Sequence, residues 1–153
     1  MDIDMSKILS DIADRKLIYL GSGAGRIVYN MGNGSVVKHA KNRFGIYQNR
    51  NEYQLNQMYK GDLLAKVLSV SDDYTILVMQ AAKTVIDMKP VLDYFHVKTR
   101  KGLFYVPELI DLARNHHLVA REFLVSRNWG LISDKPVIID YGYVRLPHRR
   151  TVL

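Results

Sequence analysis

Two oxygen-bearing side chains near the end of the chain have the types and spacing that suit metal chemistry. Asn128 lies twelve residues before Asp140, and Asp140 ends the apolar run Val137-Ile138-Ile139. This run is rich in β-branched residues and predicts a buried strand, and the residues after Asn128 predict a strand and then a turn. A hairpin would bring Asn128 and Asp140 side by side at its open end. Such a pair of oxygens suits a hard divalent cation such as Mg²⁺.

The residues around Asp140 indicate what else must lie close to it. An aspartate at the end of a buried strand is costly unless a cation meets it. Tyr141 and Gly142 follow directly, and glycine permits a sharp change of chain direction. We therefore expect a basic side chain near Asp140 and a turn at Gly142.

A glycine-rich stretch, residues 21–25, has the composition of a phosphate-binding loop. It lies between two predicted strands, residues 16–20 and 26–29, and a third strand follows at residues 35–38. Because the loop joins two antiparallel strands, it matches neither a Rossmann site nor a P-loop, which need a helix after the loop. An ordinary β-turn explains a glycine-rich hairpin equally well.

A predicted helix over residues 44–59 carries a carboxylate on its apolar stripe. Glu52, Leu55 and Tyr59 share one face at helical spacing. A buried Glu52 would need a cationic partner, and Lys38 at the end of the preceding strand is the obvious one. An exposed Glu52 without a partner fits the pattern as well.

The composition sets limits on the class of protein. The chain has 153 residues, enough for one domain with a real core, and it is 48% hydrophobic and 24% charged. It has no cysteine, which excludes disulfides and thiolate zinc sites. No apolar run is long enough to span a membrane, and the N-terminus lacks a signal peptide, so we expect a cytoplasmic protein without a membrane partner. The net charge of +7 favours anionic partners, although a solvated basic surface also accounts for it.

The remaining patterns complete an α+β fold. Strands over residues 63–70 and 74–80 would finish a five-stranded antiparallel sheet with one inserted helix. Residues 81–82 would be a connector, and residues 84–96 a helix broken near Pro90. Pro107 suits the first turn of a further helix.

The order of these features resembles the protein-kinase-like fold over residues 17–142. The motifs Gly-x-Gly-x-x-Arg-x-Val-Tyr, Val-Lys and Gly-x-x-Gln-Asn-x-x-Glu are similar to those of small kinase-like proteins encoded by bacteriophages and prophages. The resemblance implies one domain over residues 1–153, with an N-lobe at about 1–80, a hinge at 81–82 and a truncated C-lobe at 83–153. It also implies a protein that acts in the host cytoplasm.

Several nucleotide-binding roles follow from the resemblance by position, with ATP as the ligand. Gly21 and Gly23 would bring backbone amides close to phosphates, because a side chain there would block the approach. Val28 would pack on the adenine. Gln80 and Ala82 would offer backbone groups to the adenine edge.

The resemblance also implies catalytic and metal-binding roles. Lys38 would hold the α- and β-phosphates and would be oriented by Glu52. Asn128 and Asp140 would hold Mg²⁺, so Lys38, Glu52 and Asp140 are the expected catalytic residues.

The chain departs from the kinase pattern at places that matter for catalysis. The third glycine of the loop is Arg26, and Phe123 stands where a kinase has its catalytic aspartate, five residues before Asn128. Glu122 is the neighbouring candidate base, but a strand would point it to the opposite face unless a bulge intervened. By comparison with the kinase pattern, we also expect residues 1–153 to lack the helices that grip a peptide substrate.

Three functions stay open on the sequence. The first is a minimal phosphotransferase that acts on a small substrate or on itself. The second is a pseudokinase that serves as an interaction module or an inhibitor of a host protein. The third is a nucleic-acid binder that uses Lys98, Arg100 and Lys101 with the nearby Phe104 and Tyr105; a solvated loop followed by core aromatics also accounts for that segment.

Overall fold

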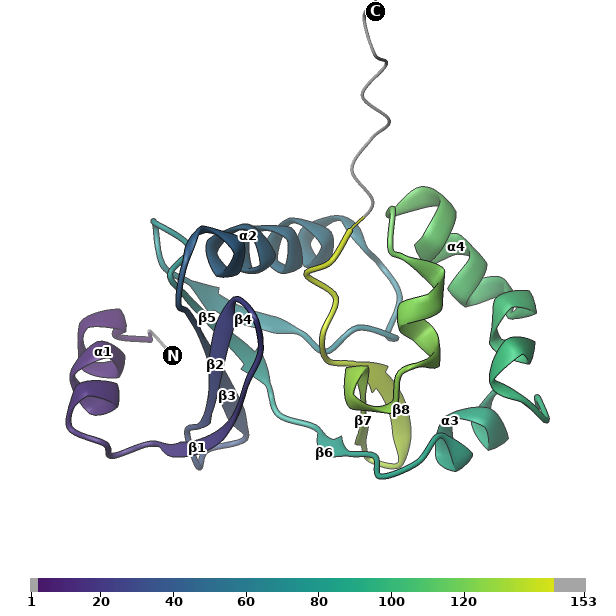
Figure 1. Ribbon diagram of the computed structural model, residues 1–153, viewed down its shortest axis with the longest axis horizontal. Coiled ribbons are helices and arrows are strands. Elements are labelled where there is room, and N and C mark those ends of the chain that lie inside the picture. The colour runs from purple at the N-terminus through teal and green to yellow at the C-terminus, as the bar shows by residue number, and fades with distance from the viewer. Residues whose placement is uncertain (1–2, 145–153) are drawn as a thin grey trace, which may run out of the picture.

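The computed structural model describes residues 3–144 and has an α+β architecture built on two antiparallel sheets (Figure 1). The larger sheet has the strand order β1-β2-β3-β5-β4 and the smaller has the order β6-β7-β8. The larger sheet consists of β1 (Ile18–Ser22), β2 (Arg26–Asn30), β3 (Ser35–Ala40), β4 (Val67–Val70) and β5 (Ile76–Gln80). The smaller consists of β6 (Lys83–Thr84), β7 (Trp129–Ile132) and β8 (Lys135–Ile138). The predicted five-stranded antiparallel sheet is therefore confirmed.

Helices flank both sheets. The α-helices are α1 (Met5–Ala13), α2 (Arg43–Met58), α3 (Lys89–Tyr94) and α4 (Pro107–Asn115). Short 3₁₀ helices cover Arg100–Tyr105, Ala120–Leu124 and Ser126–Asn128. None of the helices within residues 3–144 has the length and apolar character needed to cross a bilayer.

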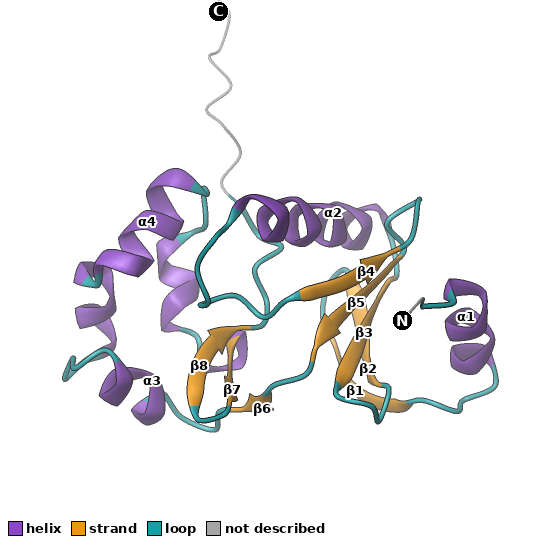
Figure 2. Ribbon diagram, turned by 180° about the vertical axis from the view of Figure 1, so that it is seen from behind, coloured by secondary structure: helices purple, strands orange, loops and turns teal. Residues whose placement is uncertain are grey.

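The two faces of the larger sheet pack against different partners, as strand alternation requires. On one face, Val37, Ile76 and Val78 form a small core with Ile8 of α1. On the other, Leu77 and Met79 join the main core. Figure 2 shows α2 along one side of this sheet and α1 on another side of it. The face that carries Leu77 is therefore the one turned toward α2 and the rest of the molecule.

Helix α2 begins at a side-chain cap and buries one stripe against the sheet. The Asn42 carboxamide oxygen accepts a hydrogen bond from the Gly45 amide at 3.1 Å, which satisfies a free donor of the first turn. The buried positions include Asn49, Glu52 and Leu55, which recur at three-residue spacing. The prediction of a helix over residues 44–59 is confirmed within about a residue at each end.

The two sheets are joined by a segment that the sequence patterns assigned wholly to the larger one. Only Val67–Val70 of the predicted strand 63–70 pairs in the larger sheet. The preceding residues turn to β8 instead: the Ala65 amide donates to Ile138 O at 2.9 Å, and the Ile138 amide donates to Leu63 O at 2.7 Å. One apolar run thus supplies hydrogen bonds to both sheets and holds them together.

The prediction for residues 84–96 was wrong, whereas that for Pro107 was correct. Residues 84–96 do not form one helix broken at Pro90; instead α3 begins at Lys89, with Pro90 in its first turn, after the short strand β6. Proline has no amide to donate, so a helix tolerates it only where that donor is not needed. The prediction that Pro107 opens a helix is confirmed by α4.

Candidate functional site

The centre of the site is a buried ion pair between β3 and α2. The Lys38 ammonium donates to both carboxylate oxygens of Glu52, at 2.9 and 3.0 Å. Glu52 is 0% exposed, so the alternative of an exposed, unpaired Glu52 is wrong. The predicted Lys38–Glu52 pairing is confirmed.

The Lys38 ammonium has its three donors in use inside the protein. Besides the two bonds to Glu52, it donates to the carbonyl oxygen of Ile139. An ammonium has three N–H groups, and all three are therefore matched to internal acceptors. A phosphate can be bound by Lys38 only in exchange for one of these contacts.

Arg26 is the residue of the site that sequence reasoning missed. In the sequence Arg26 departs from the glycine pattern, but its side chain is buried and belongs to the ion-pair cluster. One guanidinium nitrogen, Nη1, donates to Glu52 and, at 3.1 Å, to Asn49 Oδ1. The other, Nη2, donates to Asp140 Oδ1 at 3.1 Å. The cation expected next to Asp140 is therefore Arg26.

Strand register explains why Arg26 reaches this place. In the β2–β3 pairing, Arg26 lies opposite Ala40 and Val28 lies opposite Lys38. Residues that alternate along a strand share a face, so Arg26, Val28 and Lys38 all face α2. The sequence held one signal for this position. Arg26 lies two residues before Val28 on the strand that precedes the strand of Lys38, and this spacing puts both side chains on the same face.

The electrostatics of the cluster follow from two cations that share one buried carboxylate. Burial alone would raise the pKa of Glu52, but Arg26 and Lys38 outweigh it, and the net shift is downward. Burial lowers the pKa of Lys38, with Glu52 opposing the shift. Burial would also lower the pKa of Arg26, but Glu52 and Asp140 raise it. Glu52 is thus held ionised with Arg26 protonated beside it.

The segment after β8 is fastened to α2, and this sets the position of Asp140. The Tyr141 amide donates to Glu52 Oε2 at 2.9 Å, and its hydroxyl donates to Ala65 O at 2.6 Å. The Asn51 carboxamide donates to Gly142 O at 3.0 Å. With Tyr141 buried, Asp140 is directed outward, and its side chain is 47% exposed.

Gly142 is required for a reason other than the predicted turn. A Cβ at Gly142 would lie 2.8 Å from the backbone oxygen of Gln48 in α2. Gly142 does not adopt a positive φ. The glycine therefore permits close contact with the helix backbone rather than an unusual chain conformation.

The predicted hairpin is confirmed and brings the expected polar residues to one end. Trp129 pairs with Ile138, and the Ile139 amide donates to Asn128 O at 2.7 Å, one residue before Asp140. The two-residue turn has Ser133 and Asp134 at φ values of 50° and 65°, as expected of a type I′ hairpin.

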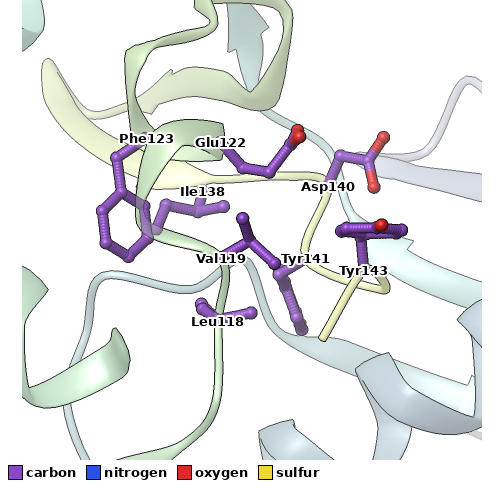
Figure 3. A pocket seen from close by; sticks show the side chains of 8 residues that line it. All are labelled: Leu118, Val119, Glu122, Phe123, Ile138, Asp140, Tyr141 and Tyr143. Atoms are coloured by element: carbon purple, nitrogen blue, oxygen red, sulfur yellow. The ribbon is translucent and has the colours of Figure 1, made fainter. Parts of the chain in front are cut away.

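Glu122 lies where the strand argument did not expect it. Residues Ala120–Leu124 form a 3₁₀ helix, so the expected strand alternation does not apply. Phe123 enters the core, whereas the Glu122 carboxylate accepts a hydrogen bond from Asn128 Nδ2 at 2.9 Å. In Figure 3 the Glu122 side chain extends toward Asp140, whereas the ring of Phe123, which also lines the pocket, points in a different direction. The prediction that Glu122 faces away from the site was wrong.

The pocket between Glu122 and Asp140 has the oxygen donors that Mg²⁺ prefers, but few of them. Asp140 has one carboxylate oxygen bound to Arg26 and is one of the residues that line the pocket, which at about 20 Å³ has room for about one water. The Asn128 carboxamide nitrogen donates hydrogen bonds to Glu122, and the Asn128 carboxamide oxygen is the atom that could bind a metal. Within the described part of the chain, no three acidic, histidine or cysteine side chains gather around a common metal position. A metal here would take its remaining ligands from water or a bound phosphate.

The glycines of the loop divide into two kinds. A Cβ at Gly21 or Gly23 would meet nothing within 4 Å, so no internal contact requires a glycine there. A Cβ at Gly25 would lie 2.8 Å from the Gly45 amide nitrogen, where the loop packs on the start of α2. Close packing explains why residue 25 is a glycine, whereas the space next to Gly21 and Gly23 is open.

Of the expected adenine-binding residues, Gln80 and Ala82 lie at the link between β5 and β6, and Val28 lies in β2. Val28 shares the face of Lys38. The Gln80 amide donates to Lys66 O at 2.8 Å, so this donor is already used within the sheet. Ala82 lies against the smaller sheet, since a Cβ at Gly130 would come within 2.6 Å of the Ala82 side chain.

The basic segment 98–105 is only partly explained by core packing. Leu103 is fully buried, but Tyr105 is 80% exposed and Phe104 also reaches the surface. Arg100 donates to Leu124 O at 3.1 Å. The interpretation of Phe104 and Tyr105 as core aromatics was wrong.

Comparison with known proteins leaves this geometry as the main basis for a functional assignment. A scan against models of protein families and a search of curated proteins both find no match for the chain.

Proposed function

We propose that the chain is a kinase-like protein that binds ATP with Mg²⁺ between its two sheets. The observation that carries the proposal is the buried Lys38–Glu52 ion pair, which Arg26 connects to the outward-facing Asp140. A strand lysine paired to a helix glutamate, next to an aspartate that follows a strand, is the arrangement that kinases use to hold nucleotide phosphates. The unpacked space above Gly21 and Gly23 supports an approach of phosphates from the loop side.

Each residue has a defined part in this proposal. Lys38 binds the phosphates by giving up its contact with Ile139 O, while Glu52 keeps the Lys38 ammonium in position. Asp140 and Asn128 hold Mg²⁺, which offsets the negative charge of the phosphates. The adenine lies against Val28, with the backbone near Ala82 as its hydrogen-bonding edge.

Phosphoryl transfer, where it occurs, has Glu122 as its candidate base. Glu122 lines the pocket with Asp140, and Asn128 fixes its carboxylate. Phe123 is in the core and cannot take a proton. Because phosphoryl transfer depends mainly on positioning and charge neutralisation, this set supports slow transfer to a small substrate or to the protein itself.

Calorimetric titration with ATP, with and without Mg²⁺, tests the proposal. We expect binding by the wild type and loss of binding in Lys38→Ala and Asp140→Asn, with melting curves to verify that both variants are folded. Tyr143→Phe, in the same pocket but without a charge, is the matched control and should bind as the wild type does. Absence of binding by the wild type at millimolar ATP would overturn the proposal.

A catalytically inactive interaction module is the second candidate, and the internal use of all three Lys38 donors favours it. In that case the ion pair serves to hold the two sheets together, and the protein acts through a host partner. Folded Asp140→Asn protein would then retain that partner in a pull-down with unchanged affinity. Loss of the partner in this variant would instead link the interaction to the nucleotide site.

The exposed aromatic and basic side chains of residues 98–105 favour nucleic acid as a further candidate partner. Tyr105 is available for stacking on a base, next to Lys98 and Lys101. Binding of a single-stranded oligonucleotide should weaken steeply with salt and weaken further in Tyr105→Ala. Salt-independent or absent binding would exclude this candidate.

A further inference from the structure

Arg26 occupies a position next to Asp140 that a metal ion would otherwise share with it. The Arg26 side chain is buried, with 4% of the residue exposed, and its Nη2 donates to Asp140 Oδ1. Asp140 is the outward-facing acid of the site, and it lines a pocket with Glu122. One of the two oxygens that Asp140 would offer a metal is therefore already bound to an internal cation.

The formal charges of the cluster are already balanced. Arg26 and Lys38 contribute two positive charges, and Glu52 and Asp140 contribute two negative charges. Glu122 lines the same pocket and adds one negative charge, so a divalent cation bound to Asp140 would still leave an excess of one positive charge close to two buried cations. Repulsion between like charges in a partly buried site is substantial, so a metal ion alone is disfavoured there.

The Arg26 side chain is held in place from the side away from Asp140. Its Nη1 donates to Asn49 and Glu52, and the Asn49 carboxamide is itself fixed by donation to Tyr74 O at 2.8 Å. A metal would thus break only the Nη2 contact with Asp140 while Arg26 keeps its place. The guanidinium charge stays near the metal, and the competition persists.

We infer that Arg26 is an internal competitor of the metal ion at Asp140, so that a divalent cation bound there weakens or displaces the Arg26–Asp140 contact. The inference rests on the proposed metal site at Asp140 and adds how the site is regulated. Bound phosphates offset the excess positive charge and give Arg26 another anion to face. The metal is therefore expected to bind together with nucleotide rather than before it.

Titration with Mn²⁺ alone, followed by electron paramagnetic resonance, tests the competition without any activity measurement. Arg26→Gln removes the charge and keeps a hydrogen-bond donor toward Asn49 and Glu52. We expect Mn²⁺ to bind Arg26→Gln about tenfold or more tightly than it binds the wild type. Arg50→Gln removes a charge from an exposed position of α2 and should leave the affinity unchanged.

A double variant identifies the metal site in this experiment. Tight Mn²⁺ binding by Arg26→Gln that disappears in Arg26→Gln/Asp140→Asn supports the inference. Equal binding by the wild type and Arg26→Gln, lost in Asp140→Asn, would overturn the competition but keep the metal site. No Mn²⁺ binding by Asp140 in any variant, with or without ATP, would overturn the proposed metal site itself.

A measurement on the wild type covers the case in which Arg26→Gln does not fold. The buried Arg26 guanidinium should give a slowly exchanging side-chain resonance in nitrogen-detected nuclear magnetic resonance. We expect this resonance to shift when Mg²⁺ and ATP are added together and to stay in place with Mg²⁺ alone. A resonance that does not respond to saturating Mg²⁺ and ATP would contradict displacement.

Discussion

The site has two halves that differ in how completely their polar groups are matched. In the buried half, Arg26, Lys38 and Glu52 satisfy one another, and Asn49 adds a further contact. In the open half, Asp140 is half exposed and lines a pocket with Glu122. The buried half is arranged to hold the sheets and helix α2 together, and the open half has oxygen atoms available to a ligand.

The contrast follows from what each half contacts. Removing one partner from a buried, hydrogen-bonded ion cluster leaves an uncompensated charge, so the buried half cannot change without a large loss of stability. The open half is solvated, so substitutions there cost little stability. Variants in the buried half should therefore affect folding first, and variants in the open half should affect binding and chemistry first.

Glu52→Gln should have the largest effect on stability. It leaves Arg26 and Lys38 as two buried cations without their shared carboxylate, and we expect a loss of about 3–5 kcal/mol in the free energy of unfolding. Urea denaturation measures it. Asp72→Asn, which removes an exposed carboxylate, should change the free energy by less than about 0.5 kcal/mol. A comparable loss in both variants would mean that net charge, and not the buried cluster, is responsible.

Gly25→Ala should have the next largest effect. The added Cβ would press on the Gly45 backbone, and we expect a loss of about 1–3 kcal/mol in the free energy of unfolding. Gly21→Ala is the matched control, because its Cβ meets open space and should change stability by less than about 0.5 kcal/mol. If phosphates approach the loop, Gly21→Ala should nevertheless weaken ATP binding in calorimetry, and unchanged affinity would contradict that approach.

The lowered pKa of Glu52 predicts a loss of stability in acid. Above pH 5 the carboxylate is ionised in both states and its contribution to stability is complete. As the pH falls through about 4.5, the unfolded chain takes up the proton first, so the free energy of unfolding decreases with decreasing pH. Urea denaturation between pH 3 and 6 should reveal this slope.

Asp73→Asn is the control for the acid experiment. Hydrogen bonds from Thr75 also lower the pKa of Asp73, but this carboxylate is exposed. The variant removes its contribution and leaves that of Glu52, so most of the slope should remain. A free energy of unfolding independent of pH in the Asp73→Asn protein would contradict the role assigned to the Glu52 cluster.

Glu122→Gln, in the open half of the site, should have a smaller effect on stability than Glu52→Gln in the buried half. The carboxamide oxygen can still accept the hydrogen bond from Asn128, so we expect a change of less than about 1 kcal/mol and unchanged ATP affinity. If the protein transfers phosphate, loss of its base should lower the rate by about 100-fold or more. Full activity in Glu122→Gln would assign the base to another group.

The sequence predicted those parts of the site that depend on local pattern. The β-branched run before Asp140 and the turn after Ile132 were sufficient for the hairpin that joins Asn128 to Ile139. Helical spacing was sufficient to put Glu52 on the apolar face of α2. Hydrophobic periodicity and turn-forming residues depend on a few neighbouring positions, so they can be recognised without knowledge of the fold.

The sequence by itself determined that Lys38 lies on a strand, Glu52 on a helix and Asp140 after a strand. It also determined the five-stranded sheet that carries Lys38. Only the tertiary structure decided that Arg26 lies between Glu52 and Asp140 and that Glu122 extends toward Asp140 while Phe123 packs in the core. A guanidinium reaches partners far along the chain, and a 3₁₀ helix turns its side chains differently from a strand. Such contacts depend on where separate elements are packed, which no local pattern of residues specifies.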